Sequence, residues 1–212
     1  MVSPLASVSR ATETKNDLIS SFGMGKTEVR VYTDYFCVPC RGAEPRIEAV
    51  LKSLFKKSLI NVTFIDAPFH KFSSLYAKYF LFILNENRSF ERALSARAIL
   101  FEAAKESMAG NKESTPDSQR KEAVSEATRL EDYLKQRGMK FSAFEVKPVF
   151  TVFERYLRED RVDATPTCVI ERGGKKEMFK GGDDIAKALE GLAGGRQASE
   201  DKKSLPSKDN TK

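Results

Sequence analysis

Two cysteines separated by two residues are the side chains in this sequence best suited to chemistry. Cys37 and Cys40 enclose Val38 and Pro39 in the sequence CVPC. The pattern predicts that the pair opens a helix, where free N–H groups and the helix dipole stabilise a thiolate and lower its pKa. We therefore expect Cys37 to be an exposed nucleophile and Cys40, one turn further in, to resolve the mixed disulfide. Pro39 suits the first turn, where its missing N–H costs nothing.

The pair has three other possible interpretations: half of a metal knuckle, a static disulfide, and two unrelated cysteines in a turn. The chain contains only three cysteines and one histidine, so a four-ligand zinc site would have to recruit carboxylates. A disulfide across so small a loop adds little stability by chain entropy. The redox interpretation, without metal or cofactor, is favoured because the CxxC lies between a predicted strand and a predicted helix.

The elements around the pair predict a βαβ unit. Residues 26–33 (KTEVRVYT) alternate in polarity and are β-branched, as in a strand. Residues 37–57 are predicted to form a helix, because Val50, Leu51, Leu54 and Phe55 supply an apolar face at helical spacing. Residues 59–65 (LINVTFI) are typical of a strand buried on both faces. A right-handed crossover between two parallel strands is the expected connection.

The rest of the chain predicts a helical block and then a closing hairpin and helix. Residues 72–160 carry helical stripes, with a loop at 110–117, and show no clear strand. Residues 165–171 (TPTCVIE) read as a strand, Gly173-Gly174 as a turn, and residues 176–180 as the returning strand. Asp183 is expected to cap a last helix over residues 185–192. The predicted fold class is therefore α/β with a helical insertion.

The predicted organisation has one folded domain with an interruption. Residues 1–25 are an N-terminal extension, in which 17–22 form either a short helix or an edge strand. Residues 26–71 and 161–193 form the α/β domain, residues 72–160 the helical insertion, and residues 194–212 a disordered tail with almost no apolar content. With 212 residues, of which 41% are hydrophobic, one real core is expected.

Composition and charge limit the kinds of partner and the cellular locations that we expect for this protein. The net charge of +6 comes without a basic block or stripe, so nucleic acid is not an expected partner. No run approaches the 18 apolar residues of a membrane span. The first ten residues lack the apolar core of a signal peptide, so the chain is either cytosolic or a mature form whose export signal has been removed.

Several stretches resemble the DsbA-like branch of the thioredoxin superfamily. VYTDYFCVPCRGAEP resembles its active-site segment, including Pro45 five residues after the second cysteine. DAPFHKFSSLYAKYF resembles its strand-to-helix entry, and DATPTCVIERGG with GGDDIAKALEGL resembles its closing strand, hairpin and helix. The resemblance covers residues 26–193. It implies a thioredoxin-like fold with the helical insertion between the second strand and a cis-proline strand, and a cis bond between Thr165 and Pro166.

The resemblance also implies roles and partners. Val38 and Pro39 would tune the redox potential, and Thr165 and Pro166 would lie against the disulfide and bind an extended substrate peptide. The implied activity is an exported, periplasmic dithiol oxidase acting on cysteine-containing proteins. A quinone-linked membrane partner would reoxidise it. No dimerisation module is evident, so a monomer is expected.

Two departures leave the direction of exchange open. Val31 stands where many relatives carry an acidic residue, six positions before the first cysteine, and Pro39 occupies the proline position of reducing thioredoxins. A reductase of the same fold is one alternative, and a non-catalytic binding module is the other.

The remaining candidates have a functional and a structural interpretation. Cys168 is either a third redox thiol or, as we favour, a small buried side chain. His70 is either a general base or, as favoured, a residue that orients the next helix. Asp34 is expected to cap or turn the chain, and Glu44 to be a solvated helix residue. Tyr35 and Phe36 form either a docking rim or core.

Overall fold

A five-stranded sheet is the centre of the structure, a computed structural model that describes residues 20–110 and 116–194. The strands are β1 (Ser21–Phe22), β2 (Thr27–Thr33), β3 (Ile60–Asp66), β4 (Thr167–Arg172) and β5 (Lys175–Lys180). Their spatial order is β1-β3-β2-β4-β5, and only β2 and β3 run parallel. Ser21–Phe22 is thus an added edge strand, one of the two outcomes expected for this segment.

The predicted βαβ unit is confirmed. Helix α1 (Val38–Lys56) connects β2 to β3, and Val29 pairs with Val62 in the parallel register. Both strands are buried along nearly their whole length, which explains their dense apolar and β-branched composition. Pro45 lies inside α1, and the helix continues through it to Lys56.

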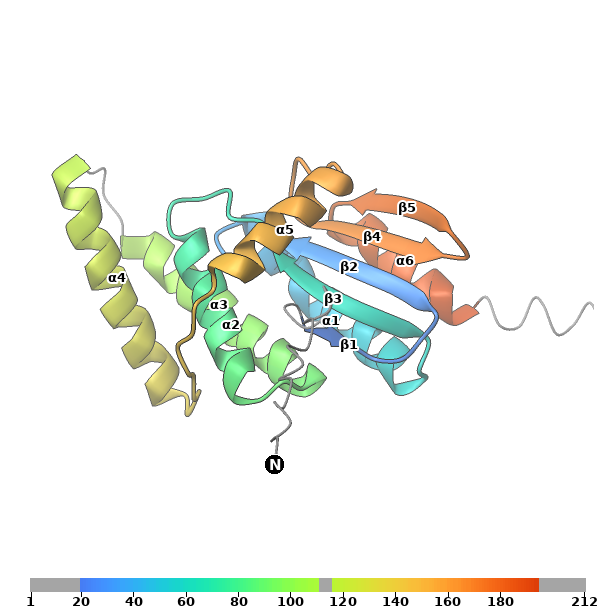
Figure 1. Cartoon of the computed structure of the whole chain (residues 1–212), viewed down its shortest axis with the longest axis horizontal. Coiled ribbons are helices and arrows are strands. Elements are labelled where there is room, and N and C mark those ends of the chain that lie inside the picture. Colours follow the sequence, from blue (N-terminus) through green and yellow to red (C-terminus); the bar gives the residue numbers. More distant parts are fainter. Residues whose placement is uncertain (1–19, 111–115, 195–212) are drawn as a thin grey trace, which may run out of the picture.

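Helices cover both faces of the sheet (Figure 1). Because side chains alternate along a strand, Val29 and Val31 of β2 face one core, shared with α1 and α6 (Gly182–Gly194). Tyr32 faces a smaller core on the opposite side, shared with α5 (Lys147–Glu159). Figure 1 shows α5 crossing in front of β2 and β4, with α1 and α6 behind the sheet.

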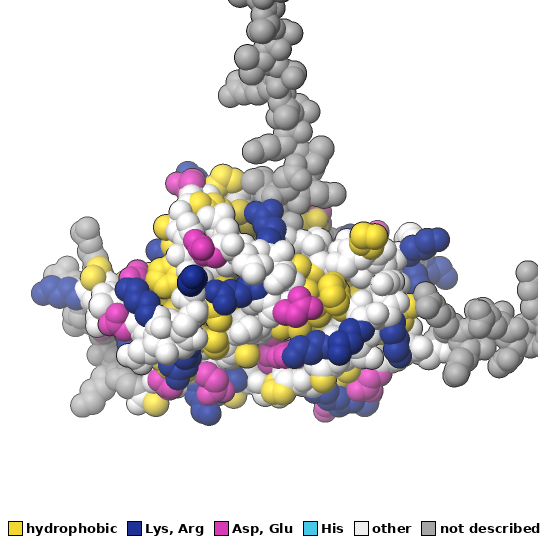
Figure 2. Space-filling view, turned by 90° about the horizontal axis from the view of Figure 1, so that it is seen from below, with side chains coloured by type: hydrophobic (Ala, Val, Ile, Leu, Met, Phe, Trp, Pro, Cys, Tyr) yellow, Lys and Arg dark blue, Asp and Glu magenta, His cyan; other side chains and the backbone are white. Residues whose placement is uncertain are grey.

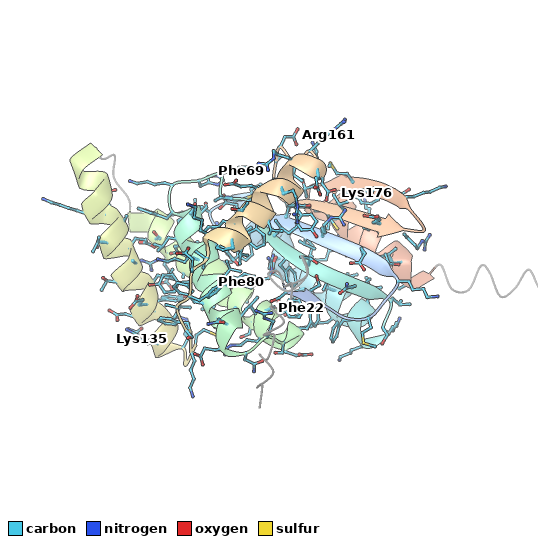
Figure 3. The ribbon with its side chains drawn as sticks, viewed as in Figure 1. Phe22, Phe69, Phe80, Lys135, Arg161 and Lys176 are labelled. Atoms are coloured by element: carbon cyan, nitrogen blue, oxygen red, sulfur yellow. The ribbon has the colours of Figure 1, made fainter. Side chains whose placement is uncertain are left out.

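One buried carboxylate fastens α5 to the sheet. Asp160, at the end of α5, accepts hydrogen bonds from Arg30 Nε at 2.6 Å, Tyr32 Oη at 2.6 Å and Lys176 Nζ at 2.9 Å. Figure 3 shows Lys176 of β5 beside this end of α5, close to Arg161. The contacts lower the pKa of the Asp160 carboxyl against the opposing effect of burial.

The helical segment predicted between β3 and β4 consists of α2 (Ser73–Glu86), α3 (Phe90–Gly110), α4 (Pro116–Gln136) and α5. Helices α2 to α4 lie to one side of the sheet (Figure 1). Tyr76 of α2 donates a hydrogen bond to Glu126 of α4 at 2.6 Å, and Arg129 donates to the Ala103 carbonyl of α3 at 2.9 Å. The core residues of α2 and α3 are continuous with those beneath α1.

The closing section contains the predicted strand, hairpin and helix, but with different bounds: β4 begins at Thr167, β5 begins at Lys175 and α6 spans Gly182–Gly194. Gly173 and Gly174 both have positive φ, 57° and 77°, as a two-residue hairpin turn requires. Helix α6 begins at Gly182, so Asp183 lies within the first turn and is not the cap we expected. The predicted loop at 110–117 lies largely, and the predicted tail almost entirely, outside the described residues.

Two observations concern the environment in which the protein can act and the partners it can bind. Among residues 20–110 and 116–194, no helix has the length and apolarity needed to cross a membrane. On the face shown in Figure 2, Lys and Arg side chains are interspersed with acidic and hydrophobic ones.

Candidate active site

Cys37 and Cys40 form a close pair at the start of α1. Cys37 is the N-cap residue, with an extended backbone, and its N–H donates to the Asp34 carbonyl at 3.0 Å. The Cys37 sulfur accepts a hydrogen bond from the Cys40 N–H at 3.3 Å and one from the Cys40 thiol at 2.7 Å. Both cysteines are free thiols. The start of α1 thus places two hydrogen-bond donors, the N–H and the thiol of Cys40, next to the Cys37 sulfur.

This arrangement makes the two thiols unequal. Hydrogen bonding from the Cys40 thiol, assisted by the Cys40 N–H, lowers the pKa of Cys37 to about 6, although burial and the negative charge of Asp34 act in the opposite direction. Burial, followed by the interaction with Cys37, raises the pKa of Cys40 far above its ordinary value. Near neutral pH, Cys37 is the thiolate and Cys40 carries the proton.

The expectation that Cys37 would be exposed is wrong. Cys37 is only 5% exposed, because the loop before β4 lies against its sulfur. The Cys37 thiol is 3.3 Å from the carbonyl oxygen of Thr165, and the peptide bond between Thr165 and Pro166 is cis. The surface beside the pair is formed by Val38, which is 53% exposed, and by the exposed Pro39.

Asp34 joins the two loops next to the pair. Its buried carboxylate accepts backbone hydrogen bonds from Phe36 at 2.8 Å, Phe69 at 2.8 Å and His70 at 3.1 Å. It also accepts the Ser73 hydroxyl at 2.6 Å. The loop after β2 and the loop after β3 therefore share one anion, which agrees with a turn-forming role for Asp34.

His70 occupies the position expected of a residue that orients a helix. Its ring Nδ1 lies 2.9 Å from the Asp34 carboxylate, and its side chain is 49% exposed. Its backbone N–H also lies 3.2 Å from the Ser73 hydroxyl, at the first residue of α2. Tyr35 and Phe36 are buried, at 1% and 7% exposure, so they belong to the core and form no docking rim.

Glu44 is buried, which contradicts the expectation of a solvated side chain. It follows Cys40 by four residues, one helical turn, and so shares the buried face of α1. Its two carboxylate oxygens accept hydrogen bonds from Nε and Nη2 of Arg97, each at 2.7 Å. Arg97 of α3 is itself fully buried and donates through Nη1 to the Thr33 hydroxyl at 3.0 Å.

A second buried carboxyl was not singled out from the sequence. Asp66, the last residue of β3, is 2% exposed, and neither of its oxygens has a hydrogen-bond partner. Burial raises its pKa to about 7, although the positive charge of Arg97 acts in the opposite direction. Two signals were present in the sequence. Asp66 directly continues an apolar strand, and Arg97 occupies an apolar helix stripe between Leu94 and Phe101.

Cys168 is a core residue. It is fully buried on β4, where it pairs with Val31 in the antiparallel register. Burial raises the pKa of its thiol to about 12, which keeps it protonated and unreactive. The structure therefore supports the buried interpretation. Among the described residues, no group of three or more His, Cys, Asp and Glu side chains is placed to hold a metal.

The sheet order, the helix that follows the CxxC and the cis-proline loop define a thioredoxin-like fold with a helical insertion. No family model matches the sequence, and no curated protein matches it. Solved structures do match. One is a candidate protein-disulfide isomerase from Pseudomonas syringae, with 17% identity, a TM-score of 0.60, and 82% of this chain and 97% of that one covered.

Two further structures have the same architecture. Pseudomonas aeruginosa DsbA2 is 18% identical with a TM-score of 0.54, covering 82% of this chain and 94% of its own. A periplasmic thioredoxin-like protein from Salmonella enterica serovar Typhimurium is 17% identical with a TM-score of 0.55, covering 90% and 99%. At these identities the likeness establishes the fold, and the activity has to be argued from the site.

Proposed function

We propose that this protein is a thiol–disulfide oxidoreductase that exchanges disulfides with protein thiols through Cys37 and Cys40. The observation that carries the proposal is the unequal thiol pair at the N-terminus of α1, with a sulfur-to-sulfur distance of 2.7 Å. A low-pKa thiol at a helix start, paired with a buried high-pKa thiol, suits reversible disulfide formation. The thioredoxin-like fold adds support by analogy.

In the oxidising direction, the Cys37–Cys40 disulfide takes two electrons from two substrate thiols. A substrate thiolate attacks the Cys37 sulfur, the bond between Cys37 and Cys40 breaks, and the Cys40 thiolate that leaves takes up a proton. A second substrate thiolate then attacks the substrate sulfur of the mixed disulfide and releases Cys37 as a thiolate. The low pKa of Cys37 favours this release, because a more acidic thiol is the better leaving group.

We assign substrate positioning to the loop before β4. Thr165 places its carbonyl 3.3 Å from the Cys37 sulfur, so an extended peptide alongside residues 165–166 would lie next to the reacting atom. Backbone pairing of this kind is a form of strand addition. Val38 and Pro39 are assigned the tuning of the redox potential, since they separate the two cysteines and are exposed beside them.

The cellular setting is part of the proposal. We place the protein in the periplasm or another exported location, as a monomeric dithiol oxidase whose thiols are reoxidised by a quinone-linked membrane partner. The similar protein from Salmonella enterica is described as periplasmic, which supports this placement. A reductase of the same fold is the alternative, which Pro39 favours because the proline has the position found in reducing thioredoxins.

An insulin-reduction assay tests the enzyme against the alternative of a binding module. Wild-type protein is expected to accelerate the precipitation of reduced insulin, and Cys37→Ser is expected to abolish this effect. Cys168→Ser is the matched control and should retain activity, because Cys168 is fully buried in β4. Equal rates for wild type and Cys37→Ser would refute the enzyme proposal and leave the binding module.

Equilibration in glutathione buffers separates oxidase from reductase. The measurement is the fraction of the Cys37–Cys40 disulfide as a function of the buffer potential. A dithiol oxidase is expected to have a midpoint toward about −120 mV, the value of a strong oxidant, because a stabilised Cys37 thiolate favours the reduced form. A midpoint near about −270 mV, as in thioredoxin, would refute the oxidising direction and support the reductase.

A further inference from the structure

A cluster of buried charges lies beneath the helix that carries the cysteines. It contains one cation, Arg97, and two carboxyl groups, Glu44 and Asp66, all at most 5% exposed. Both carboxylate oxygens of Glu44 accept hydrogen bonds from Arg97 at 2.7 Å. The Thr33 hydroxyl accepts a third hydrogen bond from Arg97 Nη1 at 3.0 Å. Asp66 accepts no hydrogen bond at either oxygen.

The strand register places Asp66 on the same side of the sheet as the redox helix. Asp66 and Thr33 are direct partners in the parallel pairing of β3 with β2, so their side chains point the same way. Thr33 contacts Arg97 on that side. Val31 and Phe64, two residues earlier on each strand, belong to the core that contains Cys40. Asp66 therefore belongs to the buried layer between the sheet and α1.

The charges in this layer do not balance if both carboxyl groups are ionised. Arg97 neutralises Glu44, and an ionised Asp66 would leave one buried negative charge that no cation pairs, which is strongly unfavourable. The other groups facing Asp66 are the Tyr35 hydroxyl, which remains protonated, and the Asp34 carboxylate, whose hydrogen bonds are supplied by its own loops. The cluster is neutral when Asp66 holds a proton.

We propose that Asp66 is a positioning residue for the redox pair: its proton keeps the buried cluster neutral, and loss of that proton places a negative charge beneath α1 that disfavours the Cys37 thiolate. The inference rests on the proposed thiol–disulfide exchange. It assigns a role to a residue on β3, whereas Val31 of β2 occupies the position where the resemblance had suggested a buried acid.

The coupling has a defined sign. Burial raises the pKa of Asp66 to about 7, close to the pKa of about 6 for Cys37, so both groups change charge in the same range of pH. Each anion raises the pKa of the other, because two negative charges in one buried layer repel. The thiolate titration of Cys37 should therefore be broader than a one-proton curve.

The test is the titration of the Cys37 thiolate in the reduced protein, followed by ultraviolet absorbance with Cys37→Ser as the blank. Asp66→Asn is expected to lower the midpoint of the Cys37 titration by about half a pH unit, which is about threefold in the acid dissociation constant. The titration curve should then have the width of a one-proton transition. The control is Asp183→Asn, an exposed carboxylate that pairs with Arg46 of α1 at 3.2 Å and should leave the curve unchanged. An unchanged midpoint in folded Asp66→Asn would overturn the proposal.

A second measurement needs no substitution at Asp66. The side-chain carboxyl carbon of Asp66 is titrated by NMR in the reduced wild-type protein and in Cys37→Ser. Coupling is reciprocal, so removal of the thiolate should lower the Asp66 midpoint. Identical midpoints would overturn the proposal. Active wild type with uncoupled titrations refutes this inference alone, whereas coupled titrations in a protein inactive toward insulin refute the proposed function alone.

Discussion

Glu44 of α1 and Arg97 of α3 form a buried ion pair, with both carboxylate oxygens 2.7 Å from guanidinium nitrogens. The two residues are 53 positions apart, one on the helix that carries the cysteines and the other in the helical segment. The Arg97 guanidinium also lies 4.5 Å from the centre of the Phe64 ring. The helical segment thus supports the cysteine-bearing helix α1 from within the core.

Removal of Arg97 is expected to destabilise the protein strongly. Arg97→Met should lower the free energy of unfolding by about 3–5 kcal/mol, because it leaves the Glu44 carboxylate buried without a partner. The matched control is Arg46→Met, which breaks the exposed ion pairs of α1 with Asp183 and Glu190 of α6 and should cost about 1 kcal/mol or less. Urea denaturation measures both. Equal losses for the two variants would contradict the interpretation.

Alkylation of Cys37 should follow its lowered pKa. The rate of modification by iodoacetamide in the reduced protein is expected to rise with a midpoint near pH 6, because only the thiolate reacts. Cys40 and Cys168 should stay unmodified over the same range, since burial raises the pKa of both thiols. Mass spectrometry of the peptides checks all three. A Cys37 midpoint near about pH 8.5 would mean that α1 does not stabilise the thiolate.

Asp66 should make the stability of the protein depend on pH. Its pKa is raised from 3.8 to about 7 on folding, so its stabilising contribution is complete below about pH 4 and is lost as pH rises through about 7. The loss amounts to about 4 kcal/mol. The difference in unfolding free energy between wild type and Asp66→Asn should shift by about this amount across that range. A difference that does not vary with pH would contradict the prediction.

Asp34 is expected to affect both the stability of the protein and the pKa of Cys37. Asp34→Ala removes the acceptor shared by the loops after β2 and β3 and should lower the free energy of unfolding by about 3 kcal/mol. In the more conservative Asp34→Asn, the pKa of Cys37 should fall, because the Asp34 charge raises it. Chemical denaturation and thiolate absorbance measure the two effects. A rise in the Cys37 pKa would contradict the electrostatic assignment.

Much of the fold could be predicted from the sequence, because its signals are local. The apolar runs that form β2 and β3, the helix after the CxxC and the Gly173-Gly174 turn each depend on residues close together in the chain. The wrong predictions concern side chains whose neighbours come from distant segments of the chain. A solvated Glu44 is the wrong prediction because Arg97, its buried partner, lies on α3. An exposed Cys37 is the wrong prediction because the loop that contains Thr165 covers its sulfur.

The sequence by itself determined the scaffold and the position of the candidate reactive groups: two cysteines at the start of a helix, in a βαβ unit closed by the strand that follows Thr165-Pro166. Spacing along one chain is enough to place those groups. The tertiary structure alone decided how deeply each thiol is buried, which buried carboxylate is paired with a cation and which buried carboxyl has a raised pKa. These outcomes depend on burial and on charges brought together from β2, β3, α1 and α3. Contacts between segments so far apart in the chain cannot be predicted from the spacing of neighbouring residues.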